Sequence, residues 1–337
     1  MKSKKLNIWL YIFIVIDVLS IICLFVLYGP WEGFRNFWIT SSMTTATHQY
    51  LARTFYTKEQ ILKTLNNNYV EEIADETDSS MITFSNNDDT GIYESIYEEQ
   101  ILKRDEGNEL YKHFEISVNN STAHIVVIYD PSRIEYALSK HVNVGGQQLV
   151  NLAKSQDAII AINASGFEMD GKRLIPTGTV IRDGKILYKS GSFSKNSGLI
   201  GFNKDNVLVL TSKSPKEAIA DGLEDAITFG PFLYVNGQPA SIKGNGGWGY
   251  APRTVIAQRQ DGIVLFIVFD GRDLDKRVLG ASMNDLIEIL GRYKAYNAAN
   301  LDGGGSSTLV INGQVINKTG GWNYSGTRYL PDAWIVK

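Results

Sequence analysis

The sequence predicts an α+β protein with a mostly antiparallel sheet system and few helices, preceded by an N-terminal transmembrane helix and a helical, acidic stalk. Three features predict this class: an apolar N-terminal run, many short β-prone runs separated by Asp-Gly or Asn-Gly pairs, and few stretches with helical periodicity. We therefore expect three parts: cytoplasmic lysines and a membrane anchor in 1–29, juxtamembrane helices and an acidic polar linker in 30–109, and one functional domain in 110–337.

Composition excludes several classes of function. The 337 residues carry a formal net charge of −3 and show no basic stripe, so we expect no nucleic acid as a partner. A single cysteine, Cys23, allows neither a disulfide framework nor a cysteine-based zinc site. The four histidines are scattered and do not show ligand spacing, so we expect neither a cofactor nor a bound metal.

The N-terminal run Leu6–Tyr28 is apolar and long enough to span a bilayer, and Lys2, Lys4 and Lys5 precede it. The positive-inside rule predicts a single-pass anchor with a cytoplasmic N-terminus and an extracytoplasmic remainder. A cleaved signal peptide is the alternative, but the run is too long and no small-residue cleavage site follows it.

The next residues are expected to form helices and then a linker. One helix is predicted at about Thr44–Arg53, and a second begins at Thr57, where Thr-Lys-Glu-Gln resembles a capping box. Asn66-Asn67-Asn68 ends the second helix. The segment 71–107 is acidic and polar, which is typical of a solvated stalk.

The C-terminal part is predicted to be rich in strands. Ile116–Val118 and His124–Tyr129 flank a turn, and Ala158–Ile162 is a buried strand. Helices are predicted over Gly146–Ser155, briefly at Pro215–Ala220, and over Asn284–Ala299. Hairpins are predicted at Asp170-Gly171, Asp183-Gly184, Asn236-Gly237 and Asp261-Gly262, and a turn at Asn312-Gly313 is predicted to close the short β run Leu309–Ile311.

The most informative stretch is Asn300–Thr308, in which Asp302 is followed by three glycines and three hydroxyl side chains. A glycine-rich loop can present several N–H groups to an anion, and no side chain stands between its main chain and a ligand. The alternative is a hairpin or bulge that needs positive φ. The neighbouring acid and hydroxyls favour the anion-binding interpretation.

Four further segments carry candidate site residues. Asn163 ends the buried strand, where a turn residue is the alternative interpretation. Trp248 lies in the glycine-rich loop 244–250, where it could stack on a sugar ring or simply pack.

Charged residues mark the other two segments. Arg253 heads an apolar strand, where a buried guanidinium requires an anion such as a carboxylate or a phosphate. Asp270 and Arg272 directly follow the apolar strand Val264–Phe269. Internal ion pairs of Asp270 with Arg272 or Arg253 are the alternative.

Taken together, Asn163–Phe167, the Pro-Arg-Thr run at 252–254, Asp270-Gly271-Arg272 and Asn300–Thr308 resemble the motifs of the phosphodiester glycosidase family. The resemblance covers about residues 115–337, and family members often have Asn-Gly-Gly-Phe where this chain has Asn-Ala-Ser-Gly-Phe. It implies hydrolysis of the bond between a sugar's anomeric carbon and a phosphodiester, on a sugar-phosphate or glycopolymer of the cell wall, capsule or exopolysaccharide. With the lysine-led anchor it suggests a Gram-positive bacterium.

The expected roles follow from that chemistry. Arg253 and Arg272 are predicted to hold the phosphate, while Asp302 and Asp270 divide between water activation or nucleophilic attack and sugar-hydroxyl binding. The remaining candidates for substrate binding are Asn163, Trp248, Asn300, Gly303, Gly304, Gly305, Ser306 and Ser307.

Two other functions remain open. A non-catalytic glycan- or teichoic-acid-binding module would use the same arginines and aromatics without needing Asp302. A metal-dependent phosphodiesterase would use Asp270 and Asp302 as ligands, although the sequence offers no histidine spacing to support a tight site.

Overall fold

The structure, a computed structural model, describes residues 2–45, 48–73, 75–84, 91–189, 197–273, 277–319 and 327–337. The chain forms two compact units. The first contains residues 1–69 and 242–249, and the second contains residues 70–241 and 250–337. Strands β1 (Tyr69–Glu71) and β16 (Ser241–Lys243) fall where the chain passes from one unit to the other.

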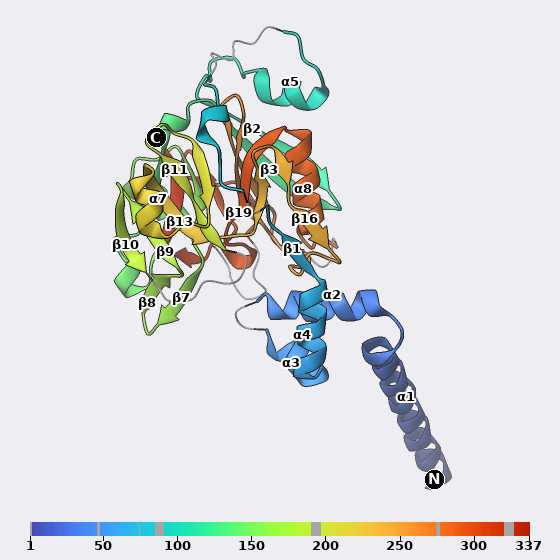
Figure 1. Cartoon of the computed structure of the whole chain (residues 1–337). Helices are drawn as coiled ribbons and strands as arrows, with labels where there is room; N and C mark the ends of the chain where they lie inside the picture. The colour runs from blue at the N-terminus through green and yellow to red at the C-terminus, as the bar shows by residue number, and fades with distance from the viewer. Residues whose placement is uncertain are drawn as a thin grey trace. The chain divides into compact units, whose positions relative to one another are not determined.

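The first unit is helical (Figure 1). Within α1, residues Ile8–Tyr28 are long and apolar enough to cross a membrane, a property that an N-terminal signal sequence shares. Lys2, Lys4 and Lys5 belong to this helix, but their side chains lie outside what the structure describes. The helices are α1 (Lys2–Tyr28), α2 (Glu32–Met43), α3 (Tyr50–Phe55) and α4 (Lys58–Asn67).

The short helices differ in part from the prediction. The Thr57 capping box is present and α4 ends at Asn67, as predicted. The predicted helix Thr44–Arg53 is wrong at its N-terminal end, because α2 ends at Met43 and α3 begins only at Tyr50. The hydroxyls of Thr44 and Thr45 donate back to the Thr40 and Ser42 carbonyls and so accompany the end of one helix rather than the start of another.

In the described part of the second unit, most strands belong to three sheets, and these are antiparallel throughout, as predicted. The largest has the order β15-β14-β19-β17-β18-β3-β2, the second β10-β9-β13-β11-β12, and the third β21-β20-β6-β23-β4. Smaller pairs are β22-β5 and β7-β8.

The bounds are as follows. The first sheet contains β2 (Tyr111–Val118), β3 (Ser121–Ile128), β14 (Phe232–Val235), β15 (Gln238–Pro239), β17 (Thr254–Arg259), β18 (Val264–Phe269) and β19 (Ala295–Asn300). The second contains β9 (Thr179–Arg182), β10 (Lys185–Lys189), β11 (Gly198–Asn203), β12 (Leu208–Thr211) and β13 (Leu223–Phe229). The third contains β4 (Ile134–Leu138), β6 (Ile160–Asn163), β20 (Leu309–Ile311), β21 (Gln314–Val315) and β23 (Asp332–Val336). The pairs are β5 (Gln147–Gln148) with β22 (Tyr329–Leu330), and β7 (Phe167–Asp170) with β8 (Arg173–Pro176). The helices are α5 (Ile96–Leu102), α6 (Leu149–Ser155), α7 (Pro215–Ala220) and α8 (Met283–Arg292), with 3₁₀ turns η1 (Ser79–Met81), η2 (Pro131–Arg133), η3 (Val142–Val144) and η4 (Gly304–Ser306).

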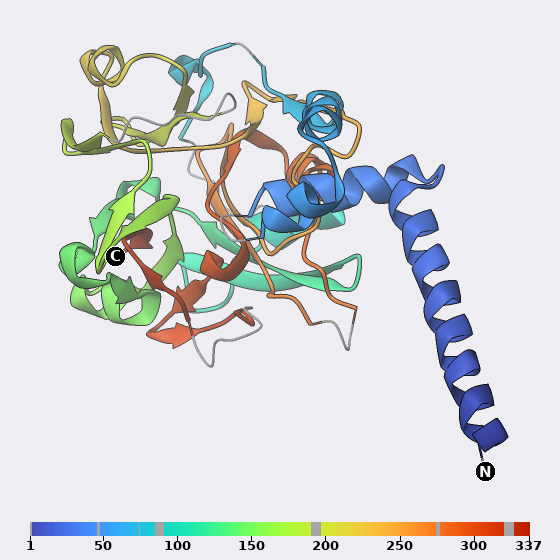
Figure 2. The ribbon, with the colours of Figure 1, turned by 90° about the horizontal axis from the view of Figure 1, so that it is seen from below.

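One hydrophobic core joins the three sheets. Val126 and Phe266 come from the first sheet, Ile200 from the second, and Ile162 and Trp334 from the third, and all five are fully buried. Side chains of this size each stabilise the fold by about 1.5–3 kcal/mol when removed from water. Figure 2 shows the red C-terminal strands among green segments, which agrees with β23 lying between β6 and β4.

The hairpin signals are confirmed. Each predicted Asp-Gly or Asn-Gly pair joins two antiparallel neighbours, in β7-β8, β9-β10, β14-β15, β17-β18 and β20-β21. The turn between β2 and β3 uses Asn119 and Asn120 at φ 47° and 64°, a left-handed pair typical of tight hairpins.

The predicted helix over Asn284–Ala299 is wrong beyond Arg292. Helix α8 begins at the Ser282–Asp285 capping box and ends at Arg292, and β19 follows after Lys294, which has φ 55°. Strand β19 is paired on both sides, with β17 and β14. Its alanines favour a helix in isolation, but their small side chains let a strand be buried between two neighbours, and that pairing overrides local propensity.

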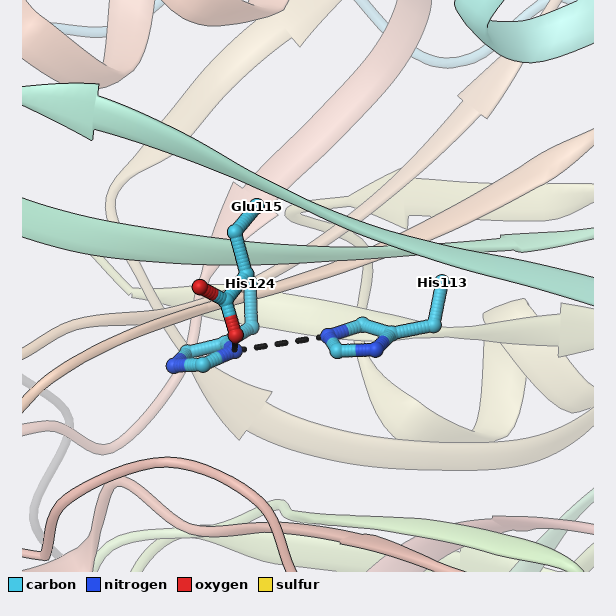
Figure 3. A group of neighbouring side chains, drawn as sticks. All are labelled: His113, Glu115 and His124. Atoms are coloured by element: carbon cyan, nitrogen blue, oxygen red, sulfur yellow. Dashed lines mark hydrogen bonds and ion pairs between the residues drawn. The ribbon is translucent and has the colours of Figure 1, made fainter.

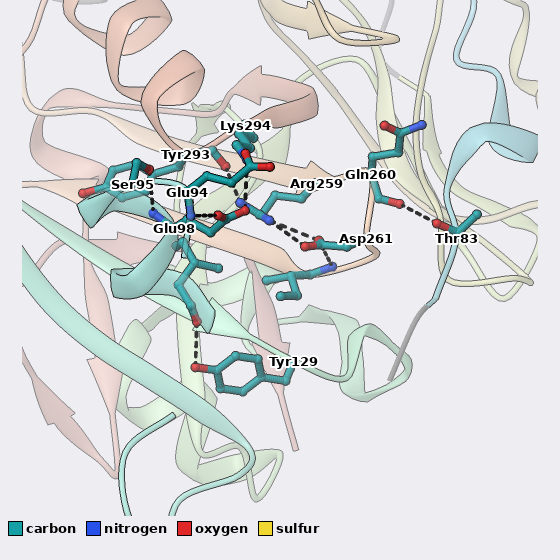
Figure 4. Close-up of polar contacts among 12 residues, drawn as sticks. Thr83, Glu94, Ser95, Glu98, Tyr129, Arg259, Gln260, Asp261, Tyr293 and Lys294 are labelled. Carbon is teal, nitrogen blue, oxygen red and sulfur yellow. Dashed lines mark hydrogen bonds and ion pairs between the residues drawn. The ribbon is translucent and has the colours of Figure 1, made fainter. Parts of the chain in front are cut away.

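The acidic segment predicted as a linker makes specific contacts within the second unit, although residues 74 and 85–90 lie outside the described chain. Lys294 binds Glu98 at 2.9 Å, the Tyr129 hydroxyl donates to the Ile101 carbonyl at 3.0 Å, and the Thr83 N–H donates to the Gln260 carbonyl at 2.9 Å (Figure 4). Ile101 is fully buried. Apolar residues interspersed among the acids allow this packing.

Candidate active site

The loop after β19 is held against two other strand ends. The Leu301 N–H donates to the Thr254 carbonyl at 2.8 Å, the Gly304 N–H to Pro252 at 2.9 Å, and the Asp302 N–H to Ala164 at 3.3 Å. Segments near residues 163, 253 and 302 are therefore brought together.

The glycines of the loop serve close packing. A Cβ on Gly303 would lie 2.8 Å from the Pro252 carbonyl oxygen and 3.9 Å from Cδ of Arg253, and Gly304 has φ 62°. The N–H groups of Gly304, Ser306 and Ser307 donate to backbone carbonyls, and that of Gly303 donates to the Asp302 carboxylate. These four N–H groups are thus engaged within the protein.

Asp302 lies half-buried at the centre of the loop. Burial raises its pKa to about 6, although the Ser306 hydroxyl, the Arg328 charge and the Gly303 N–H all act to lower it. Arg328 also donates to the Ser306 hydroxyl at 3.4 Å and stacks over the ring of Phe167 at 4.8 Å. A carboxyl with this pKa changes charge near neutral pH.

A second acid, Asp332, was not among the predicted site residues. It is buried and accepts hydrogen bonds from the Ser165 N–H at 2.9 Å, the Ser165 hydroxyl and the Tyr136 hydroxyl at 2.9 Å. Burial raises its pKa to about 6, and the charge of Asp302 raises it further against these hydrogen bonds. An acid at the head of the apolar run 333–336 is the sequence signal that could have found it.

Asn163 connects three segments of the site through hydrogen bonds. Its buried amide oxygen accepts from the Thr254 hydroxyl at 2.7 Å and from the Thr308 N–H at 3.1 Å, and its Nδ2 donates to the Asp302 carbonyl at 2.6 Å. These bonds join β6, β17 and the loop, so Asn163 is more than a turn residue.

Asn300 is also buried, and its Nδ2 donates to the Gly230 carbonyl at 3.0 Å. Its Oδ1, together with the hydroxyls of Ser307 and Thr308, is buried without a hydrogen-bond partner among the residues described. Unsatisfied acceptors and hydroxyls next to an acid are consistent with a polar ligand at this position.

The two predicted arginines lie within each other's electrostatic reach. Arg253 is buried, and its Nε donates to the Ala281 carbonyl at 3.2 Å. Burial, aided by the positive charge of Arg272, lowers the pKa of Arg253 to about 9, so it stays protonated at neutral pH. Arg272 is exposed and donates to the Tyr250 carbonyl at 2.8 Å.

The carboxylate of Asp270 is held by hydrogen bonds to residues other than those that surround Asp302. Its Oδ1 accepts from Nε2 of His124 at 3.0 Å and from the Lys318 N–H at 2.8 Å. Burial acts to raise the pKa of Asp270, but these hydrogen bonds outweigh it and the pKa is lowered. Asp270 is therefore an anion at neutral pH, unlike the easily protonated Asp302.

Trp248 belongs to the first unit, unlike the other predicted site residues. Added Cβ atoms on Gly247 and Gly249 would lie 2.3 Å from the Asn68 carbonyl oxygen and 2.2 Å from the Ser41 hydroxyl. The glycines of this loop are thus explained by packing within that unit. Contact between Trp248 and a sugar stays a prediction.

The second unit combines two acids whose pKa is about 6, Asp302 and Asp332, with Arg253, a buried guanidinium that is positively charged at neutral pH. Such a pairing can hold an anionic group while a carboxylate acts on a neighbouring atom.

Comparison with known proteins adds the family context. A model of a family described as phosphodiester glycosidase matches residues 156–337. An uncharacterized SPbeta prophage-derived protein of Bacillus subtilis, YomE, is 30% identical over 180 residues, covering 51% of this chain and 27% of that protein. Human N-acetylglucosamine-1-phosphodiester alpha-N-acetylglucosaminidase is 26% identical over 179 residues, covering 48% of this chain and 33% of the enzyme. The chain thus spans about a third or less of the length of these two relatives.

Among solved structures, the zebrafish N-acetylglucosamine-1-phosphodiester alpha-N-acetylglucosaminidase catalytic domain, auto-inhibited by its pro-peptide, has a TM-score of 0.55 at 19% identity. The match covers 69% of this chain and 85% of that domain. This likeness shows a shared fold.

Proposed function

Because this chain belongs to the phosphodiester glycosidase family, we propose that it is a hydrolase that cleaves the bond between a sugar's anomeric carbon and a phosphodiester. The products would be a free sugar and a phosphomonoester. The observation that carries this proposal is the position of Asp302 on a glycine loop that packs directly against Arg253.

The leaving group determines what the site must provide. A phosphomonoester leaves readily, so protonation of the leaving oxygen matters less than holding the phosphate and stabilising an oxocarbenium-like transition state. Arg253, buried and protonated, and the exposed Arg272 are suited to bind the phosphate. The hydroxyls of Ser306 and Ser307 and the amide of Asn300 flank Asp302 in the sequence and can contact the substrate, with Gly303–Gly305 leaving room for it.

The three acids differ in their surroundings, and we assign their roles accordingly. Asp302, deprotonated above about pH 6, is the group we assign to attack on the anomeric carbon or to activation of water. Asp270, whose pKa is lowered, is suited to accept hydrogen bonds from sugar hydroxyls. Asp332 touches no predicted substrate group and is assigned to positioning, since Ser165 and Tyr136 hold it.

The proposed cellular location is argued from helix α1. We propose that Ile8–Tyr28 anchors the chain in a membrane with the second unit outside the cytoplasm, where a cell-wall, capsule or exopolysaccharide phosphodiester is the substrate class. The length and hydropathy of this helix support the anchor.

The test is a product assay. The detergent-purified full chain is incubated with UDP-N-acetylglucosamine, in which a diphosphate is esterified to the anomeric carbon of the sugar, and released free sugar is measured. We expect turnover that is lost in Asp302→Asn and retained in Asp205→Asn, a matched control in an exposed turn. Binding without turnover would support a glycan-binding module instead, and chelator-sensitive release of sugar-1-phosphate would support a metal-dependent phosphodiesterase.

A further inference from the structure

The β2–β3 hairpin gathers three metal-binding side chains that lie apart in the sequence. Glu115 and His124 are directly opposed in the antiparallel register, and His113 lies two residues from Glu115 on the same face of β2. One ligand atom from each lies within 4.8 Å of the others, and Figure 3 shows the two imidazole rings meeting with the Glu115 carboxylate beside them. The linear spacing of the histidines gave no sign of this cluster.

Two of the three separations between ligand atoms match those of a tetrahedral zinc site. Nε2 of His113 lies 3.3 Å from Nδ1 of His124, and Oε1 of Glu115 lies 3.3 Å from that same Nδ1. Two ligand atoms that are each ~2.0–2.1 Å from a tetrahedral zinc are about 3.3–3.4 Å apart.

Asp270 fixes which nitrogen of His124 is available. Nε2 of His124 lies 3.0 Å from the Asp270 carboxylate, so it carries a proton and donates. The lone pair of a neutral His124 is then on Nδ1, the atom that faces His113 and Glu115. A carboxylate that orients a metal-binding histidine through its other ring nitrogen is a recurrent feature of metal sites.

We propose that His113, Glu115 and His124 bind one zinc ion, with Asp270 as a positioning residue behind His124. Two imidazoles and a carboxylate suit zinc, and a fourth position stays open to solvent because the Glu115 side chain is 57% exposed. The His124 side chain is only 5% exposed, so the surrounding residues hold its imidazole in place. The ion would cross-link β3 to the edge strand β2 of the largest sheet.

Binding is measured on the full chain, purified in detergent with a tag that lacks histidine and then stripped with a chelator. Equilibrium dialysis against buffered zinc, followed by elemental analysis, gives the stoichiometry and affinity. We expect one zinc per chain at micromolar free zinc or below. His113→Gln and Glu115→Gln should each weaken binding by roughly tenfold or more, and Asp270→Asn by roughly 10- to 100-fold.

Two controls separate the site from other effects. His141→Gln and Glu168→Gln change a histidine and a glutamate outside the cluster and should bind zinc like the unmodified chain.

Bound Co²⁺ should give the intense visible absorption of tetrahedral coordination, which His113→Gln abolishes. Absence of stoichiometric zinc, or zinc binding that is unchanged in both His113→Gln and Glu115→Gln, would overturn the proposal. Neither readout depends on sugar release.

Discussion

Asp302 and Asp332 are two neighbouring acids whose burial raises the pKa of each to about 6. Their surroundings differ: Asp302 interacts with the Ser306 hydroxyl, the Arg328 charge and the Gly303 N–H, whereas Asp332 is enclosed by Ser165 and Tyr136. The first was predictable because three glycines follow it. The second was not, because its partners come from β4 and the end of β6, far away in the sequence.

The raised pKa of Asp302 predicts the pH dependence of catalysis. If Asp302 acts in its deprotonated form, kcat/KM should rise about tenfold per pH unit below about pH 6 and level off above it. A pH–rate profile with UDP-N-acetylglucosamine measures this. A profile that instead falls as pH increases through 6 would assign Asp302 the role of a proton donor.

The same pKa predicts an effect on stability. The folded state holds the Asp302 proton up to about pH 6 and the unfolded chain only to its ordinary value of 3.8, so the stability that depends on this proton is lost as pH rises between those values. Asp302→Asn should therefore raise the free energy of unfolding at pH 7 by on the order of 1–3 kcal/mol, with little change at pH 3.5. Urea unfolding at both pH values measures this, and a variant destabilised at pH 7 would contradict the assigned burial.

At the scale of elements, the turns were predictable and the strand after α8 was not. Asp-Gly and Asn-Gly pairs specify hairpins through local backbone conformation, so each predicted one is present. Whether residues 295–300 continue a helix depends on β17 and β14, which are distant in sequence. The meeting of His113, Glu115 and His124 likewise depends on the register between β2 and β3.

The packing of Gly303 gives a prediction at this scale. Gly303→Ala would place a Cβ 2.8 Å from the Pro252 carbonyl oxygen, so the loop must move away from Arg253. We expect kcat/KM to fall by about tenfold or more, because small displacements of a site are costly. Gly313→Ala, at φ 74° in open space, is the control: it should cost about 1 kcal/mol of stability and leave kcat/KM unchanged. Unaltered catalysis in Gly303→Ala would remove the loop from the site.

At the scale of the whole molecule, the sequence predicted mostly antiparallel sheets, whereas the second unit contains residues 70–241 and 250–337 and not the expected 110–337. The sequence could not show that loop 242–249 belongs to the helical unit, because the glycines that pack against Asn68 and Ser41 look like those of a binding loop. The acidic composition of segment 71–107 also gave no indication of its contacts with the rest of the second unit, such as the burial of Ile101.

Helix α1 predicts where the protein is found in a cell. The full chain should sediment with membranes and be released by detergent but not by high salt, because its apolar run is long enough to span a bilayer. A variant lacking residues 2–29 should remain in the soluble fraction. Fractionation followed by immunoblotting measures both, and a soluble full chain of undiminished size would contradict the anchor.

The most direct test of cleavage at the anomeric carbon is to trace the oxygen atom that water contributes to the products. UDP-N-acetylglucosamine is hydrolysed by the full chain in ¹⁸O-labelled water, and both products are examined by mass spectrometry. Cleavage at the anomeric carbon predicts that the label enters the free sugar and that the released UDP carries none. Label in a phosphate group of the product would show cleavage at phosphorus and contradict the account.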